Sequence, residues 1–357
     1  MTRAGRYVRA ARRWARLARP PRDRDEVRVS YGWDEIPAPG EPVAGGTSKF
    51  QKLARRFPNR PGDFTLLYLG SSALPRDLRP LLALARRRGI PVVVNQDGVA
   101  YPGWAGDRVA AINAPLRRAL GAATHVLYQS AFCKHSADAF LGEPGGSWEV
   151  IPNAVDVEAF TPGAPPAGGP VLLLGGDQTQ PYRLELALRT LAELAKTHDG
   201  AQLVVTGRVT APLDPLVAEL GLAGRVRVTG RYAQRDAPAL YRDAHVLLHT
   251  KVNDPCPNVV LEALACGLPV VYPASGGTPE LVGDAGIGVP HPDGFDRDEP
   301  PAPVALAAGV VSALASRDEL SRSARRRAVE RFPLDAWLER HAALFAELVA
   351  RARRPAR

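Results

Sequence analysis

Two carboxylates flank the start of a predicted helix in the second half of the sequence. Asp254 lies in a proline-containing loop, and Glu262 lies about one turn inside an apolar stretch that begins at Asn258 and ends at Gly267. This order of residues predicts a loop, a helix stopped by glycine and then a buried strand. Backbone N–H groups at a helix start favour a phosphate or a sugar oxygen, because partial positive charge gathers there. A carboxylate in the same crevice can accept hydrogen bonds from a ribose diol.

The sequence around these acids resembles the C-terminal domain of the retaining GT-B glycosyltransferases of family four. That family carries an acidic residue, seven others and then Glu, followed by an Ala-rich helix and Gly-x-Pro-Val-Val. Asp254 and Glu262 occupy the two acidic positions, with Asp where the family usually has Glu. Residues 150–156 resemble the family's interdomain signature, and residues 275–282 resemble its following loop. The resemblance therefore covers most of the chain, in three motifs that occur in the expected order.

The resemblance implies a retaining enzyme that moves a hexose-type sugar from a nucleoside-diphosphate sugar to a hydroxyl acceptor, such as a lipid-linked or cell-envelope glycan. Asp254 would position the sugar hydroxyls and Glu262 the ribose, while the junction at Pro257, Asn258 and Val259 would bind the donor. Helix dipoles and basic side chains would stabilise the departing phosphate in place of a metal. The implied partners are a nucleotide sugar and a glycan acceptor, with no cofactor and no metal site.

Two glycines and two basic residues complete the predicted donor site. Gly45 and Gly46 precede a predicted helix and resemble the family's glycine pair, although a bare turn explains them equally well. After the first strand of the second domain the family usually has Gly-Arg and, several residues later, Lys. This chain departs there, with Asp177 near the expected Arg. Arg183 and Lys251 are the candidates for the missing cation, and a solvated surface charge is the alternative for each.

A second departure concerns the first domain. The family often places a His close to the anomeric carbon, where this chain has Asn95, Gln96 and Asp97. Any of the three could hydrogen-bond sugar or acceptor hydroxyls, and Asp97 could act as a base toward the acceptor. A turn at Asp97-Gly98 is the competing explanation.

Alternating strand and helix patterns predict the elements that would hold these residues. Predicted strands cover residues 26–31, 64–69, 90–95 and 125–129, and helices cover 49–57, 78–88, 108–120 and 131–141. The alternation restarts with strands at 171–174, 202–206, 225–229, 246–249, 269–272 and 286–289, and helices at 184–196, 213–220, 236–243 and 258–266. Three further helices are predicted at 302–316, 318–331 and 334–350. Such a series predicts parallel sheets covered on both faces.

The predicted fold is α/β and of the GT-B type, with two Rossmann-like domains whose parallel sheets face a central cleft and a C-terminal helix that crosses back. The Pro- and Gly-rich stretch 161–170 is the predicted linker. We therefore expect a basic amphipathic N-terminal helix at 1–24, an acceptor-side domain at 25–163, a donor-binding domain at 164–333, and a crossover helix with a basic tail at 334–357.

Most of the net charge of +9 lies at the two ends of the chain. Residues 1–24 contribute +8 and residues 351–357 contribute +4, which leaves about −3 for the body and argues against a nucleic-acid partner. The N-terminal arginines oppose an apolar arc that includes Tyr7 and Trp14, so this helix could lie on an anionic membrane. Docking on the body, a disordered tail and a transit peptide are the alternatives.

Three cysteines, Cys133, Cys256 and Cys266, match neither a disulfide framework nor a metal motif, which favours a reducing compartment. Without a spanning segment or a secretory signal, we expect a cytoplasmic protein that can be peripheral on the inner face of the membrane. Two other functions fit the same fold. One is a nucleotide-sugar epimerase, and the other is a non-catalytic glycan-binding or scaffold protein.

Overall fold

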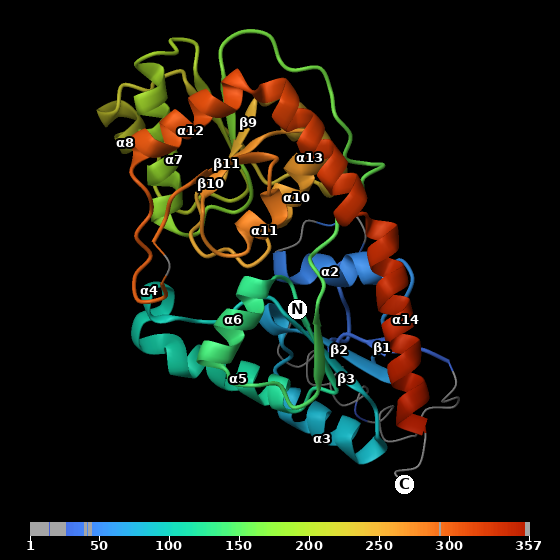
Figure 1. Cartoon of the computed structure of the whole chain (residues 1–357). Helices are drawn as coiled ribbons and strands as arrows, with labels where there is room; N and C mark the ends of the chain where they lie inside the picture. Colours follow the sequence, from blue (N-terminus) through green and yellow to red (C-terminus); the bar gives the residue numbers. More distant parts are fainter. Residues whose placement is uncertain (1–13, 15–25, 39–40, 42–44, 293, 354–357) are drawn as a thin grey trace. The chain divides into compact units, whose positions relative to one another are not determined.

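The chain folds into two compact units, each with its own parallel sheet (Figure 1). The computed structural model describes residues 14, 26–38, 41, 45–292 and 294–353. The first unit combines Met1–Pro152 with Asp335–Arg357, and the second is Asn153–Leu334. The predicted α/β class with two parallel sheets is confirmed. The helix predicted at 1–24 lies outside the described residues except for Trp14, which is half-buried against the hydrophobic cluster of the first unit.

The first sheet has five parallel strands in the order β1-β2-β3-β4-β5. The strands are β1 Val29–Ser30, β2 Leu66–Gly70, β3 Val92–Gln96, β4 His125–Tyr128 and β5 Ser147–Val150. Strands β2, β3 and β4 are buried along their whole length, as is typical of strands covered on both faces. Their register pairs Asn95 with both Gly70 and Leu127, so the loops that follow these strands begin at one edge of the sheet.

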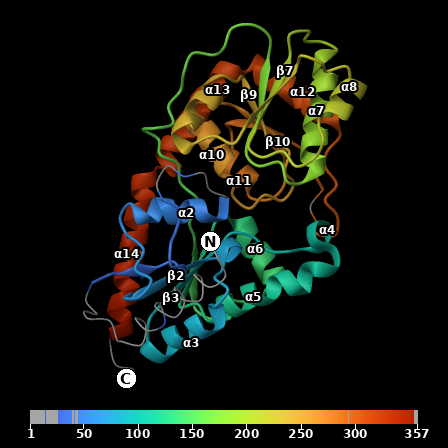
Figure 2. The same ribbon diagram turned by 180° about the vertical axis from the view of Figure 1, so that it is seen from behind.

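Helices cover both faces of this sheet (Figure 2). They are α2 Gly45–Ala54, α3 Leu78–Arg88, α4 Pro102–Ala105, α5 Val109–Gly121, α6 Ala131–Phe140 and α14 Leu334–Arg353, with 3-10 turns η1 Ser71–Ala73 and η2 Gly106–Arg108. Helix α3 ends as predicted, because Gly89 follows it with a φ of 63°, a left-handed conformation that glycine adopts without strain.

Aromatic side chains hold α2 and α14 against one face. The ring of Tyr68 in β2 lies 6.3 Å from Phe50 of α2 and 5.8 Å from Phe345 of α14, both at steep angles. The neighbouring Leu67 and Leu69 join the cluster formed with α3 and α5. Because successive strand residues point to opposite faces, the two helix pairs cover opposite sides of β2.

The buried His341 of α14 predicts a dependence of stability on pH. Burial lowers its pKa from 6.5 to about 4, so the folded chain holds it neutral where the unfolded chain begins to bind a proton. We therefore expect the free energy of unfolding to fall as the pH drops from about 6.5 toward 4. His341→Gln, which cannot titrate, should weaken this dependence in urea unfolding at pH 7.5, 6 and 5. The exposed His135→Gln is the control, and an unchanged pH profile in the His341 variant would refute the assignment.

The second sheet has six parallel strands in the order β11-β10-β9-β6-β7-β8. The strands are β6 Val171–Leu174, β7 Gln202–Thr206, β8 Val226–Gly230, β9 Val246–Leu248, β10 Val270–Pro273 and β11 Gly286–Val289. The chain runs outward in one direction from β6 and in the other from β9. The boundary between β6 and β9 is therefore the topological switch point, beside which open α/β sheets bind their ligands.

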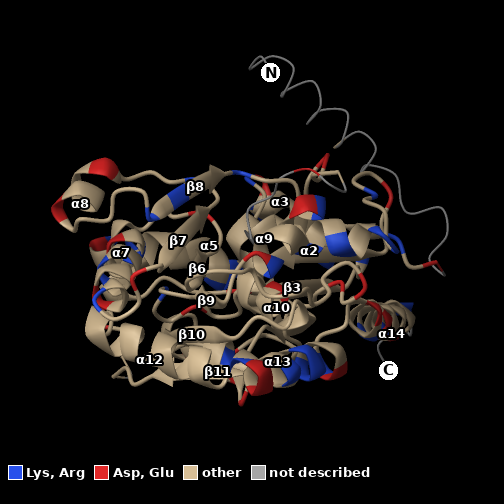
Figure 3. Cartoon of the chain, turned by 90° about the horizontal axis from the view of Figure 1, so that it is seen from above, with Lys and Arg blue, Asp and Glu red and all other residues tan. Residues whose placement is uncertain are grey.

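Among the described residues, seven α-helices and one 3-10 turn connect and cover these strands. They are α7 Pro181–Ala195, α8 Asp214–Glu219, η3 Gln234–Asp236, α9 Ala237–Arg242, α10 Asn258–Ala265, α11 Thr278–Val282, α12 Pro303–Ala315 and α13 Arg317–Arg331. Figure 3 shows basic and acidic residues side by side on α13. No helix in the described part of the chain has the length and hydropathy needed to span a membrane.

The boundary between the units falls after Pro152, not within the predicted linker at 161–170. The residues between these points pack on the second unit. Val155 exchanges backbone hydrogen bonds with Phe332 and Leu334, and Phe160 is buried in the same hydrophobic cluster. The Pro- and Gly-rich stretch is thus a surface loop of the second unit, since the hydrophobic residues before it already belong there.

Candidate functional site

The two carboxylates lie at the switch point of the second sheet. Strand β9 ends at Leu248, the loop that contains Asp254 follows, and α10 begins at Asn258 with Glu262 in its second turn. The start of α10 approaches the loop after β6 so closely that a Cβ added to Gly175 would lie 3.2 Å from the side chain of Val259. The junction predicted from the sequence therefore presents the N-terminus of α10 at the edge where this fold class binds ligands.

Asp254 is held as a carboxylate by nearby cations. Its Oδ2 lies 3.1 Å from Lys251 Nζ and 3.6 Å from His249 Nε2, and its side chain is 13% exposed. Burial alone would raise the pKa of Asp254, but Lys251 and the more distant Arg183 hold it below its usual value. Burial lowers the pKa of His249 to about 3, so this ring is neutral at pH 7. Asp254 can therefore accept hydrogen bonds from sugar hydroxyls without first losing a proton.

The loop after β10 fixes the backbone of Asp254. Gly277 N donates to the Asp254 carbonyl at 2.9 Å, and Ser275 Oγ accepts from Asn253 N at 3.0 Å. Asn253 has a φ of 52° and Gly276 a φ of 70°, and a Cβ at Gly276 would come within 2.6 Å of the Asp254 backbone. Within the segment 275–282, which resembles the family's loop, Gly276 must therefore be glycine so that this loop can approach the backbone of Asp254 closely.

Glu262 is buried, at 8% exposure, and both of its oxygens have donors. Oε2 accepts from Tyr241 Oη at 2.7 Å, and Oε1 accepts from Gln234 Nε2 at 3.0 Å. Burial, together with the negative charge of Glu262, raises the pKa of Tyr241 well above 10, so the phenol stays a donor. Each carboxylate oxygen retains a second lone pair, so the orientation fixed by Tyr241 leaves capacity for a further hydrogen bond.

The cations near the missing family Arg come from several elements. Arg183 of α7 is buried, and its Nη1 donates to the Asp177 carbonyl at 3.1 Å. The Asp177 carboxylate accepts from Arg208 N at 2.8 Å and from Arg231 Nη2 at 3.4 Å. The sequence singled out Arg183 and Lys251 but missed Arg231, whose guanidinium pairs with Asp177, and Arg208, which contributes its backbone N–H. Both follow strand ends, after β7 and β8, which is a signal that could have found them.

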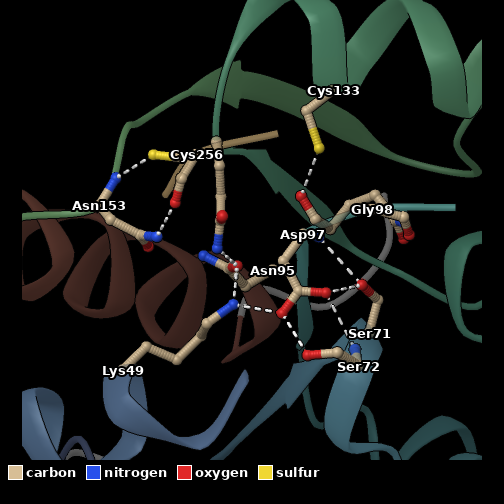
Figure 4. A network of polar contacts seen from close by, with 11 residues as sticks. Lys49, Ser71, Ser72, Asn95, Asp97, Gly98, Cys133, Asn153 and Cys256 are labelled. Atoms are coloured by element: carbon tan, nitrogen blue, oxygen red, sulfur yellow. Dashed lines mark hydrogen bonds and ion pairs between the residues drawn. The ribbon is translucent and has the colours of Figure 1, made fainter. Parts of the chain in front are cut away.

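A separate polar cluster lies at the carboxyl edge of the first sheet (Figure 4). Lys49 of α2 is 2% exposed, and its Nζ lies 2.5 Å from Asp97 Oδ2 and 2.8 Å from Asn95 Oδ1. Ser71 Oγ, Ser72 Oγ and Ser72 N also donate to the Asp97 carboxylate. Burial opposes ionisation of Asp97, but Lys49 and the serines lower its pKa below the usual value. A carboxylate with this many donors is a weak base, so the geometry favours a positioning role.

The predicted glycine pair opens helix α2, which carries Lys49. A Cβ at Gly46 would collide with the Ser72 side chain, so glycine at this position allows α2 to approach the serines that hold Asp97. Gly45 is the first residue of α2. Lys49 itself was not among the site residues predicted from the sequence, because nothing local marks a lysine whose partners lie nearly fifty residues away.

Two units, each built on a parallel sheet covered by helices, are the architecture of the GT-B glycosyltransferase fold. Residues 169–298 match the family model of Glycosyl transferases group 1. It covers β6 to β11, including Asp254 and Glu262.

Curated relatives match over part of their length. A D-inositol 3-phosphate glycosyltransferase of Geodermatophilus obscurus is 35% identical over 199 residues, which cover 50% of this chain and 43% of the relative. An MMP alpha-(1->4)-mannosyltransferase of Mycolicibacterium hassiacum is 28% identical over 206 residues, which cover 57% of this chain and 49% of the relative. The matched segments thus span about half the length of these relatives.

Solved structures share the fold at low identity. Sucrose-phosphate synthase of Thermosynechococcus elongatus has a TM-score of 0.68 at 20% identity and covers 85% of this chain and 77% of its own. Anabaena HepE in complex with UDP-glucose has a TM-score of 0.62 at 19% identity. The match covers 80% of this chain and 79% of the HepE chain.

Proposed function

We propose that this chain is a retaining glycosyltransferase that moves a hexose-type sugar from a nucleoside-diphosphate sugar to a hydroxyl acceptor. The observation that carries the proposal is the pair Asp254 and Glu262 at the start of α10, at the switch point of the second sheet. This sheet lies within the segment that matches the family model of Glycosyl transferases group 1. The presence of UDP-glucose in the HepE structure supports a nucleotide-sugar donor. The names of the curated relatives support transfer to a hydroxyl acceptor.

The roles of the residues follow from the charge that develops when the donor breaks. The departing diphosphate gains negative charge. In this proposal the N-terminus of α10 and the cations Lys251, Arg183 and Arg231 of the second unit stabilise that charge. Asp254 accepts from sugar hydroxyls and Glu262 from the ribose. The leaving phosphate takes the acceptor proton on the same face, so no enzyme nucleophile is required and the configuration is retained.

The acceptor in this proposal is a glycan or lipid-linked glycan, reached from the cytoplasmic side, with the basic segment 1–24 on an anionic membrane. Asp97, Asn95 and Lys49 form a rigid buried cluster on the first unit, which can hold the ends of β2 and β3 in place to position an acceptor hydroxyl. A non-catalytic glycan-binding protein is the second candidate, favoured by Gly176 and Asp177 in the place where the family usually has Arg.

A screen of nucleotide sugars tests the proposal directly. UDP-, GDP-, ADP- and dTDP-sugars are added singly, and the shift of the melting temperature and the release of nucleoside diphosphate are measured. We expect one donor to raise the melting temperature and to be hydrolysed slowly without acceptor, since bound ligand stabilises the folded state. Conversion of the sugar to its epimer would assign the epimerase activity instead. The absence of stabilisation by any donor would reject the proposal.

We also infer that transfer needs no metal ion, because basic side chains and a helix dipole can stabilise the negative charge of the departing diphosphate in place of a metal cation. Once a donor is found, its turnover should be unchanged after dialysis against EDTA. A rate that collapses in EDTA and returns with Mg²⁺ or Mn²⁺ would overturn this inference.

A further inference from the structure

A cavity of about 840 Å³ opens at the amino edge of the first sheet, away from the cluster around Asp97. Its lining comes from the starts of β3, β4 and β5, from one side of α3 along its length, and from the ends of α5 and α14, all within the first unit. The Lys49 and Asp97 cluster lies instead where β2 and β3 end, at the opposite edge. The cavity is therefore separate from the residues assigned to glycosyl transfer, and its volume suits a small-molecule ligand.

Four arginines, Arg79, Arg86, Arg118 and Arg351, line this cavity. Arg351 pairs with Glu347 one turn back on α14. Among the residues that the structure describes, no Asp or Glu lines the cavity. The concentration of positive charge is therefore not balanced inside it.

The ends of three helices do not account for this charge. Helices α3, α5 and α14 direct their C-termini toward the cavity, and each end carries roughly half a negative charge. Their sum of about −1.5, together with the Glu347 carboxylate that pairs with Arg351, leaves a net charge of about +1.5 on the four guanidinium groups. Guanidinium groups bind phosphate oxygens through paired, charge-assisted hydrogen bonds, so phosphate is the anion that this lining fits best.

The remaining lining is aliphatic. Leu82, Ile90, Val92 and Leu348 form its buried part, and Ala83 and Ala122 lie exposed at the rim. Within the described chain no aromatic ring lines the cavity, so it offers no surface on which a nucleobase could stack. A ligand with an aliphatic portion beside its phosphate would use both parts of the lining.

We infer that this cavity binds a phosphate ester with an aliphatic substituent, from a lipid headgroup or from a soluble metabolite. The inference is independent of the proposed transferase function, since binding can be measured without turnover. The probe is dihexanoyl phosphatidic acid below its micelle concentration, titrated into the full chain by calorimetry. We expect one saturable site.

Two variants test whether the cavity itself is responsible. Arg86→Ala with Arg118→Ala removes two of the lining charges, and Ala83→Trp fills the space without a change in charge. The double arginine variant should weaken binding roughly tenfold or more, the loss expected for charge-assisted hydrogen bonds to phosphate. Ala83→Trp should weaken binding to a similar extent, because the indole ring takes up space that the ligand needs. Arg76→Ala with Arg108→Ala is the matched control, because both arginines are exposed on the first unit and lie outside the cavity. This control should bind as the unaltered chain does.

The remaining measurements distinguish the ligand parts and sources. Glycerol 3-phosphate, which lacks the chains, should bind more weakly than the lipid. Vesicles that contain phosphatidic acid should sediment with the chain in an Arg86- and Arg118-dependent way if the source is a membrane, whereas binding of the monomer alone indicates a soluble ligand. No saturable binding, equal loss in the control pair, or full binding by Ala83→Trp would overturn the inference.

Discussion

Replacing Glu262 with glutamine should lower kcat/KM for the nucleotide sugar by roughly 10- to 100-fold, the range expected from one to two hydrogen bonds to a charged group. Glutamine has nearly the same volume and can still accept from Tyr241, so the buried contact at 2.7 Å persists in part. What is lost is the negative charge that the proposed function assigns to ribose binding. The measurement is steady-state release of nucleoside diphosphate from the donor identified by the screen.

Glu262→Ala tests whether the protein is an enzyme or a non-catalytic scaffold. An enzyme should lose donor turnover, whereas a scaffold should keep its partner binding. Alanine also leaves the Tyr241 hydroxyl without its acceptor, at a cost of about 1–3 kcal/mol in stability. The glutamine variant separates this structural loss from the loss of function. Glu219→Gln, at an exposed position on α8, is the control and should turn over donor normally. Normal turnover by both Glu262 variants would remove this carboxylate from the donor site.

Replacing Lys49 with methionine should destabilise the first unit by about 3–5 kcal/mol, the cost of leaving one partner of a buried ion pair uncompensated. The Lys49 and Asp97 side chains are only 3% and 7% exposed, and the lysine also donates to Asn95 at 2.8 Å. In the native chain the lowered pKa of Asp97 gives stability that is present above pH 3.8 and lost as the pH falls further. Urea unfolding of the two chains measures the difference.

A double variant shows whether the loss comes from the stranded carboxylate. Lys49→Met with Asp97→Asn should be more stable than Lys49→Met alone, because the amide carries no charge to be buried. Lys196→Met, which breaks an exposed contact with Glu193, should change stability by less than about 1 kcal/mol. If Lys49→Met cost no more than Lys196→Met, the buried pair would have no structural role.

Strongly patterned elements were predictable from the sequence. The strands at 171–174, 202–206 and 286–289 and helix α3 have the predicted bounds, because each combines an apolar pattern with clear end signals. Strand β5 was missed because it is an edge strand whose residues are mostly exposed, so it carries no apolar run. Helices α4 and α11 were missed because four or five residues show no helical period.

The candidate site was predictable only where its residues are neighbours in sequence. Asp254, Glu262 and the start of α10 follow from one continuous motif. The contacts of Glu262 with Gln234 and Tyr241, and the pairing of Lys49 with Asp97, join segments brought together by sheet order. Such contacts depend on tertiary packing, which composition and periodicity do not record. The departure from the family pattern at Asp177 was visible in the sequence, but the contacts of the surrounding arginines with Asp177 were not.

The discontinuous first unit has a practical consequence for dissecting the chain. Helix α14 contributes the fully buried Phe345 and His341 to the first unit, so a truncation that removes α14 would open that core. Residues 153–334, by contrast, form an uninterrupted segment whose entry and exit are joined by backbone hydrogen bonds at Val155. The second unit should therefore be obtainable by simple expression of that segment, whereas the first unit requires residue 152 to be joined to residue 335 by an engineered connection.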